Sequence, residues 1–187
     1  GPLFNFILAF IVSLIMVQFI VIQEPVITEV TQESAAQEAG LLPGDRIIYS
    51  GVNKTRINID DAIEYDAGVY TAESILQFEL LNASAMEHGK VIPVLPRLNA
   101  GSQFGMSKED LCDAIARRAD YPGVQIVGIH YFTGTQRKKL SEQKAELTML
   151  KELMDELKEK FGYQVEKLEY GPGLPVPYFT TEDFADT

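Results

Sequence analysis

Three predicted strands end in residues that can bind a phosphate or another oxyanion. Glycines at such points let backbone N–H groups approach a phosphate, and a threonine hydroxyl can donate to it. An arginine supplies a fixed fork of donors. One such feature alone is usually a turn or a surface residue, whereas three on successive strands favour a phosphate or cofactor site. The residues are Arg97, then Thr133, Gly134 and Thr135, and finally Gly171, Pro172 and Gly173.

Metal and cysteine chemistry are not predicted. His88 and His130 stand far apart and lack the spacing of metal ligands, and the sequence contains no HExxH pair. The single cysteine, Cys112, excludes an internal disulfide framework and lies in a helical pattern, where we expect a packed apolar residue. We therefore predict no metal site and name no catalytic residue.

Composition narrows the choice of partners. The 187 residues carry a net charge of −11, which argues against nucleic acid or an anionic membrane surface as a partner. With 46% hydrophobic residues the chain is typical of a globular protein rather than a disordered one. Its length allows one ordinary domain, or one small domain with an appendage.

From residue 47 onward the sequence alternates between strand and helix patterns. Short connections between such segments are typical of right-handed βαβ units and a parallel sheet. Pro93 and Pro96 are unusual for a central strand, and Ser107 with Asp110 comes close to a capping box. Predicted strands cover 47–51, 91–98, 124–132 and 165–173, with another beginning at 69, and predicted helices cover 59–68, 74–89, 107–119 and 140–161.

Parallel strands direct their carboxyl ends to one edge of the sheet, so the three phosphate-binding features should meet there. We expect the turn at 134–135 and the loop at 171–173 to be near neighbours within reach of one phosphate. Arg97 should lie farther off, with Phe132 between it and the two turns.

Residues 3–22 form an apolar run without a charge. About 20 such residues match the hydrocarbon thickness of a bilayer, so we predict a transmembrane-like helix over 1–23 that does not pack into the α/β part. A signal peptide would need a basic amino-terminal region and a small-residue cleavage site. A buried soluble helix is the other alternative, although few are apolar all round for this length.

The next segment, 24–46, contains AGLLPGD at 39–45, in which Gly40 can end a short helix and Pro43 and Gly44 can form a turn. It resembles the opening half of a PDZ domain. Together with GPLFNF at 1–6, it resembles the site-2 protease family of intramembrane zinc metalloproteases. The zinc-binding histidines that such a protease needs are missing from the sequence.

Five motifs in the rest of the chain, 47–187, carry a second resemblance. They are SGVNK at 50–54, AES at 72–74, PRLNAGSQFGM at 96–106, GIHYFTGTQ at 128–136 and YGPGLPVPYF at 170–179. In this order they resemble the barrel domain of the pyridoxal-phosphate fold-type III decarboxylases, which act on diaminopimelate, ornithine or arginine, with the alanine racemase barrel as a more distant relative. The resemblance implies an α/β fold with a partial (β/α)8, or TIM-type, barrel of parallel strands. It also implies pyridoxal phosphate as cofactor, an amino-acid substrate and a dimeric parent enzyme.

The resemblance assigns cofactor contacts by position. Arg97 matches the residue that contacts the phenolic oxygen of the cofactor ring. Phe132 stands where the family often places a histidine on the face of that ring, and an aromatic side chain can still stack there without the polar role. His130 matches a less central position. The predicted cofactor-binding residues are Arg97, Phe132, Gly134, Thr135, Gly171 and Gly173.

The family's Schiff-base lysine lies on the first barrel strand, upstream of the part that matches residue 47. Lys54 falls at a later strand end and lacks the matching context. We therefore expect the chain as given to be inactive and the cofactor not to be attached covalently. At most five of eight barrel strands are represented, so we also expect open sheet edges.

Three interpretations of function follow. The first is a fragment of a pyridoxal-phosphate-dependent amino-acid decarboxylase of the diaminopimelate, ornithine or arginine type. The alternative is a membrane-anchored fragment of a site-2-type zinc metalloprotease with a PDZ module, and the third is a non-enzymatic module whose PDZ-like segment holds a peptide. A decarboxylase part implies a cytoplasmic location, whereas a membrane span at 3–22 implies a membrane location and partner.

Overall fold

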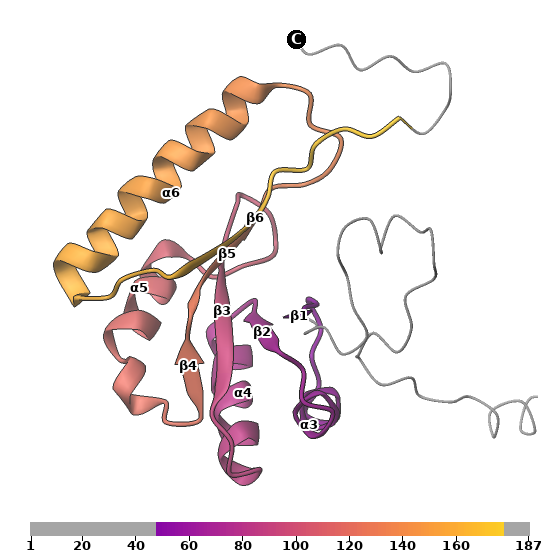
Figure 1. The fold of residues 1–187 in the computed structure, drawn as a ribbon, viewed down its shortest axis with the longest axis vertical. Coiled ribbons are helices and arrows are strands. Elements are labelled where there is room, and N and C mark those ends of the chain that lie inside the picture. Colours follow the sequence, from indigo (N-terminus) through magenta and orange to yellow (C-terminus); the bar gives the residue numbers. More distant parts are fainter. Residues whose placement is uncertain (1–47, 178–187) are drawn as a thin grey trace, which may run out of the picture.

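The computed structural model describes residues 48–177, in which parallel strands alternate with helices (Figure 1). The strands form one six-stranded sheet in the order β1-β2-β3-β5-β6, with β4 paired to β3, and every pairing is parallel. The strands are β1 Ile48–Tyr49, β2 Val69–Ala72, β3 Ile92–Leu98, β4 Val124–Ile126, β5 Gly128–Phe132 and β6 Lys167–Gly171. The helices are α3 Arg56–Glu64, α4 Ile75–Glu87, α5 Lys108–Ala116 and α6 Leu140–Phe161, with a short 3₁₀ helix at Arg118–Asp120.

This arrangement confirms the predicted α/β fold with parallel strands. The predicted transmembrane-like helix at 1–23 and the PDZ-like segment at 24–46 lie outside the described residues. Between residues 48 and 177, no helix is long and apolar enough to cross a membrane.

Capping residues in the sequence determine where the helices begin and end. Ser74 and Ser107 each accept a hydrogen bond from a backbone N–H three residues further on, at 3.2 and 3.0 Å. Helix α3 begins three residues before its predicted start because Thr55 and Asn58 form a capping box. Helix α6 has the predicted bounds and ends at Gly162, whose backbone is left-handed.

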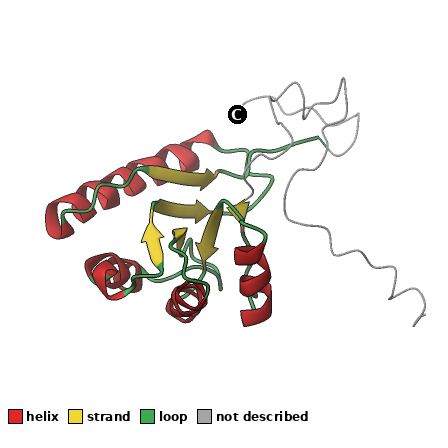
Figure 2. Cartoon of the chain, turned by 60° about the horizontal axis from the view of Figure 1, so that its bottom comes forward, coloured by secondary structure: helices red, strands yellow, loops and turns green. Residues whose placement is uncertain are grey.

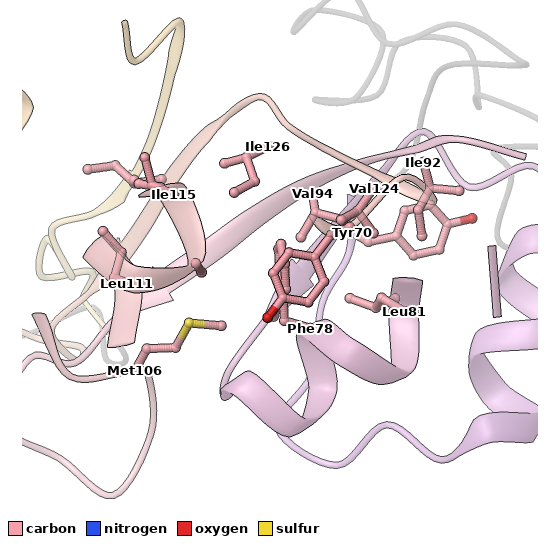
Figure 3. Close-up of a cluster of buried hydrophobic side chains, with 14 of the residues drawn as sticks. Tyr70, Phe78, Leu81, Ile92, Val94, Met106, Leu111, Ile115, Val124 and Ile126 are labelled. Carbon is pink, nitrogen blue, oxygen red and sulfur yellow. The ribbon is translucent and has the colours of Figure 1, made fainter. Parts of the chain in front are cut away.

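The two faces of the sheet have different environments. Figure 2 shows the helices along one side of the curved row of strands. Tyr70 and Val94 point to this side and are fully buried in the apolar core (Figure 3). Because side chains alternate along a strand, the residues next to Tyr70 in β2 and next to Val94 in β3 point to the opposite, inner face of the sheet. Buried polar residues of β2, β3 and β5 occupy this inner face: Thr71, Arg97 and His130, with Glu73 directly after β2.

Helices supply the rest of the core. Their apolar side chains recur at the spacing that places them on one face, so each helix buries a stripe against the sheet. Cys112 lies half-buried against this core, and burial raises the pKa of its thiol. The fully buried helix residues include Phe78, Leu81, Leu111, Ile115, Leu150 and Leu157.

Two prolines lie in the central strand β3, although proline cannot donate to a strand ladder. Pro93 precedes Val94, where the pairing with β2 begins. Pro96 lies between Val94, the last residue in register with β4, and Arg97, the first in register with β5. Each proline therefore lies at a gap in the pairing of β3 with one of its neighbours, which explains why this strand tolerates both.

The single strand predicted over 124–132 is divided in the structure. It breaks at Val127, whose N–H donates to the carbonyl of Val94 at 3.0 Å, and β5 then pairs with β3 from Arg97 onward. Gly128 opens β5 because a Cβ there would overlap the carbonyl oxygen of Lys167 on β6. The break thus occurs where the register with β3 shifts by one residue, from Ile126 opposite Val94 to His130 opposite Arg97, which the apolar pattern of the sequence does not reveal.

Candidate functional site

The turn after β5 and the loop after β6 are in contact at the carboxyl edge of the sheet. Gly134 and Gly173 have φ angles of 128° and 65°, in the left-handed region that favours glycine. A Cβ on Gly173 would overlap the carbonyl oxygen of Gly134 and would lie 3.1 Å from the Cα of Thr135. We call Gly134, Thr135, Gly171 and Gly173 the glycine cradle, because backbone amides in glycine turns of this kind can bind phosphate.

Phe132 separates the glycine cradle from Arg97, as the parallel geometry predicts. A Cβ on Gly171 would overlap the Phe132 ring. The guanidinium carbon of Arg97 lies 5.4 Å from the centre of the same ring and 5.8 Å from the centre of the Phe104 ring. Arg97 therefore rests near two aromatic rings, within the range of cation–π attraction.

A buried ion pair holds Arg97 in place. Its Nη1 donates to Oε2 of Glu73 at 2.9 Å, and the two side chains are only 9% and 5% exposed. Its Nη2 donates to the carbonyl of Phe132 at 3.4 Å. A buried charge needs such partners because an unpaired one is strongly destabilising. This pair fixes the plane of the guanidinium while leaving its Nε without a partner among the described residues.

Unpaired buried atoms form a row on the inner face of the sheet. Arg97 Nε, His130 Nδ1 and Glu169 Oε2 are the buried side-chain atoms between residues 48 and 177 that lack a hydrogen-bond partner. Arg97 is in register with His130, and His130 with Glu169. Such atoms are rare in folded proteins. Three of them on neighbouring strands indicate a place where a polar ligand or water completes the bonding.

Burial controls the charge of this row. It lowers the pKa of His130 to about 4, helped by the positive charges of Arg97 and Lys54. It also raises the pKa of Glu169. Both effects favour the neutral side chain, because a charged group loses its hydration when it is buried. Arg97 is then the cation of the row, paired with Glu73.

Lys54 is a buried amine close to this row. Its Nζ donates to the carbonyl of Gly51 at 2.5 Å and to Oγ1 of Thr71 at 3.2 Å. Burial lowers its pKa to about 8, although the Glu73 carboxylate opposes the shift and Arg97 adds to it. Lys54 is also the first lysine in the sequence, so no lysine precedes it on an earlier strand.

The structure brings the predicted residues together. Gly134, Thr135 and Gly173 are in contact, Gly171 meets the Phe132 ring, and the guanidinium carbon of Arg97 lies 5.4 Å from the centre of that ring. Their role as cofactor-binding residues stays a prediction.

Sequence reading missed three residues of this site. Glu73 lies within the AES motif but carried no sign that it pairs with Arg97. For Lys54 the sequence raised only the question of covalent attachment, and for Arg137 it predicted no role. Among residues 48–177, no group of His, Cys, Asp and Glu could hold a metal ion.

A parallel βα sheet with glycine turns and a buried arginine at its carboxyl edge is the arrangement of a barrel-type domain, in which ligand sites lie at this edge. The chain belongs to the pyridoxal-dependent decarboxylase family, because residues 30–187 match the pyridoxal binding domain of that family. The cofactor of this domain is pyridoxal phosphate.

Individual relatives agree with the family assignment. The chain is 32% identical over 158 residues to a diaminopimelate decarboxylase of Zymomonas mobilis, covering 76% of this chain and 37% of the relative. It is 27% identical over 169 residues to an L-glutamyl acyl-carrier protein decarboxylase of Niallia circulans, covering 81% and 38%. The crystal structure of the diaminopimelate decarboxylase of M. jannaschii in complex with L-lysine superimposes with a TM-score of 0.66 at 25% identity, covering 75% and 36%. The chain thus spans little more than a third of the length of these relatives.

The two resemblances predicted for residues 1–46 have a different outcome. None of these comparisons supports the site-2 protease or PDZ resemblance. The family match begins at residue 30, inside the range 24–46 that we predicted to be PDZ-like. The decarboxylase resemblance is therefore confirmed at the level of the family.

The residues present fit pyridoxal phosphate in two respects. The contact between Gly134 and Gly173 leaves no room for a side chain at Gly173, which suits a turn that binds phosphate through its backbone. The free Nε–H of Arg97 is a charged donor without an acceptor, which suits the phenolic oxygen of the cofactor ring.

Proposed function

We propose that this chain is the cofactor-binding part of a decarboxylase that acts on a basic or diamino acid. The observation that supports this most directly is the contact between the two glycine turns, with Arg97 across Phe132 from them. The substrate class is supported by the relative from Zymomonas mobilis, which is a diaminopimelate decarboxylase, and by the M. jannaschii enzyme, which was solved with L-lysine.

The phosphate, the phenolic oxygen and the ring of the cofactor would each contact different residues of the site. The glycine cradle would bind the phosphate through its backbone amides and the Thr135 hydroxyl. Arg97 would donate from Nε to the phenolic oxygen, and Phe132 would pack against the ring. When bound, pyridoxal phosphate serves as the electron sink that makes loss of the substrate carboxylate possible.

The remaining residues prepare this site. Glu73 orients the Arg97 guanidinium and balances its charge, so the arginine can face an anionic ring oxygen without moving. Burial shifts the pKa values of His130 and Glu169 in the directions that favour their neutral forms, which limits the competing charge beside Arg97. Phe132 lies near both Arg97 and Gly171 but cannot donate or accept a proton. Any proton transfer at the ring face must therefore come from another group.

Covalent attachment is not expected from the lysines in this chain. The family resemblance places the covalent lysine on a strand that precedes residue 47, and no lysine precedes Lys54. We therefore propose that the cofactor binds this chain reversibly, through its phosphate and ring oxygen.

The test is a titration of the full chain with pyridoxal phosphate, followed by absorbance and then by dialysis. We expect saturable binding that dialysis reverses. Gly173→Ala should abolish it, because the new Cβ would overlap the carbonyl oxygen of Gly134. Gly101→Ala is the matched control, since Gly101 also has a positive φ of 83° but has open space around its Cβ position.

Three results would contradict the proposal. Absence of saturable binding would remove the cofactor function, and unchanged binding by Gly173→Ala would show that the cradle is not the phosphate site. A stoichiometric label on one lysine after borohydride reduction would show that a covalent residue is present. Peptide mapping should then begin with Lys54, whose amine is buried beside this row.

A further inference from the structure

Arg137 contacts both turns of the glycine cradle and the helix that follows the first one. Its Nη1 donates to Thr133 Oγ1 at 2.5 Å and to the carbonyl of Pro172 at 3.4 Å. Its backbone N–H donates to the carbonyl of Gly173 at 2.8 Å. Its guanidinium also forms hydrogen bonds of 2.6 and 3.0 Å with Glu146 on α6. One side chain thus joins three segments that meet at the cradle.

Glu146 extends the same network to β6. The hydroxyl of Tyr170, at the end of β6, donates to Glu146 Oε2 at 2.6 Å. The Arg137 and Glu146 side chains are 17% and 15% exposed, so the pair is largely shielded from water. Burial alone would raise the pKa of Glu146, but the hydrogen bonds from Arg137 and Tyr170 outweigh it and lower the pKa. The carboxylate therefore stays charged and keeps Arg137 engaged.

This engagement argues against the simplest role for an arginine beside a phosphate site. A guanidinium that binds phosphate needs free donors, whereas both terminal nitrogens of Arg137 already donate to Glu146, and Nη2 also donates to Glu142 at 3.2 Å. A phosphate would have to displace a charged partner that is already in place. The geometry instead suits a side chain that holds the surrounding backbone.

The cradle needs such a support because its own residues supply little. Its three glycines have no side chains to pack, and glycine backbone has the greatest conformational freedom. The hydrogen bond from Thr133 N–H to the carbonyl of Gly171 is long, at 3.5 Å. Hydrogen bonds from amides to a phosphate weaken steeply when distance and angle change. The spacing between the two turns is therefore expected to control phosphate affinity.

We propose that Arg137, acting with Glu146, is a positioning residue that sets the spacing of the glycine cradle. This inference rests on the proposed cofactor function. It assigns to Arg137 no contact with the cofactor itself.

The experiment measures binding of pyridoxal phosphate and of inorganic phosphate to the full chain and to four variants. Arg137→Ala and Glu146→Gln should each weaken both ligands about tenfold or more, and Arg137→Lys should restore part of the loss. The control is Arg117→Ala, which removes an exposed arginine paired with Asp113 on α5 and with Asp120 in the 3₁₀ helix, and it should leave both affinities unchanged.

Glu146→Gln separates positioning from direct binding. If Arg137 were itself a phosphate ligand, removal of its carboxylate partner would free the guanidinium and strengthen binding. If it positions the cradle, the same change loosens the network and weakens binding. Stronger binding by Glu146→Gln, or unchanged binding by a folded Arg137→Ala, overturns the proposal.

Hydrogen exchange supplies a readout that does not depend on ligand. In Arg137→Ala, the amides at 133–137 and 171–173 should exchange faster, while those of β3 and α4 stay as protected as in the unaltered chain. Faster exchange throughout would mean that Arg137 only stabilises the fold, which overturns the positioning role. If the unaltered chain binds neither ligand, the cofactor function fails, and exchange confined to the two turns still decides whether Arg137 holds them.

Discussion

At the scale of single residues, the inner face of the sheet is organised by strand register rather than by distance along the chain. Glu73 and Arg97 are 24 residues apart, yet they meet because β2 and β3 pair in parallel up to Ala72 and Pro96, one residue before each. Arg97 could be predicted because a donor at a strand end is a local feature. Its partner could not, because a shift of one residue in the register would move Glu73 to the other face.

His130 should make stability depend on pH in a defined window. Its pKa is lowered to about 4 in the folded chain, below the ordinary value of 6.5, chiefly by burial. Between these values the unfolded chain binds a proton that the folded chain does not, so stability is lost as pH falls from 6.5 to 4. In His130→Gln, we expect the free energy of unfolding to fall by about 1–3 kcal/mol less over this pH range than in the unaltered chain. Urea unfolding at several pH values measures it, and parallel curves for both proteins would contradict the assignment.

At the scale of elements, the close approach of β5 to β6 depends on one glycine, Gly128. Gly128→Ala should destabilise the fold by about 1–3 kcal/mol, because its Cβ would overlap the Lys167 carbonyl and force β5 and β6 apart. Gly162→Ala is the control, since it has open space and only a left-handed φ of 60° to strain, which costs about 1 kcal/mol. Urea unfolding compares them. An equal or smaller loss for Gly128→Ala would mean that the strands adjust freely.

The same elements show what a sequence pattern can and cannot predict. The bounds of α6 were predicted because a long amphipathic repeat ends at a glycine, and both signals are local. The break at Val127 was missed because apolar residues continue through it, and it coincides only with a one-residue shift in the register with β3. Likewise the network around Arg137 joins two turns and a helix, and a lone arginine after a glycine turn gives no sign of that.

At the scale of the whole molecule, the chain joins an apolar segment to a cofactor-binding part, and we expect them to act independently. Removing residues 1–23 should leave the urea midpoint of the α/β part unchanged and should abolish binding to lipid vesicles. Leu14→Arg is the matched variant, because a charge at the centre of a membrane helix disfavours insertion by about 2.5–3.5 kcal/mol. A large fall in the urea midpoint after the deletion would show instead that the segment packs against the sheet.

The order of the strands has a consequence for how the chain is made. Each strand of the described sheet lies beside the strand that precedes it in the chain, except β5, which pairs with β3 rather than with β4. Translation delivers about 5–20 residues per second, whereas local strand and helix formation takes microseconds. The sheet can therefore lengthen on the ribosome by one βα unit at a time, because the strand with which each new strand pairs has already formed. Until the next unit emerges, that edge is open to other nascent chains, which makes synthesis the stage at which this protein is most exposed to misassembly.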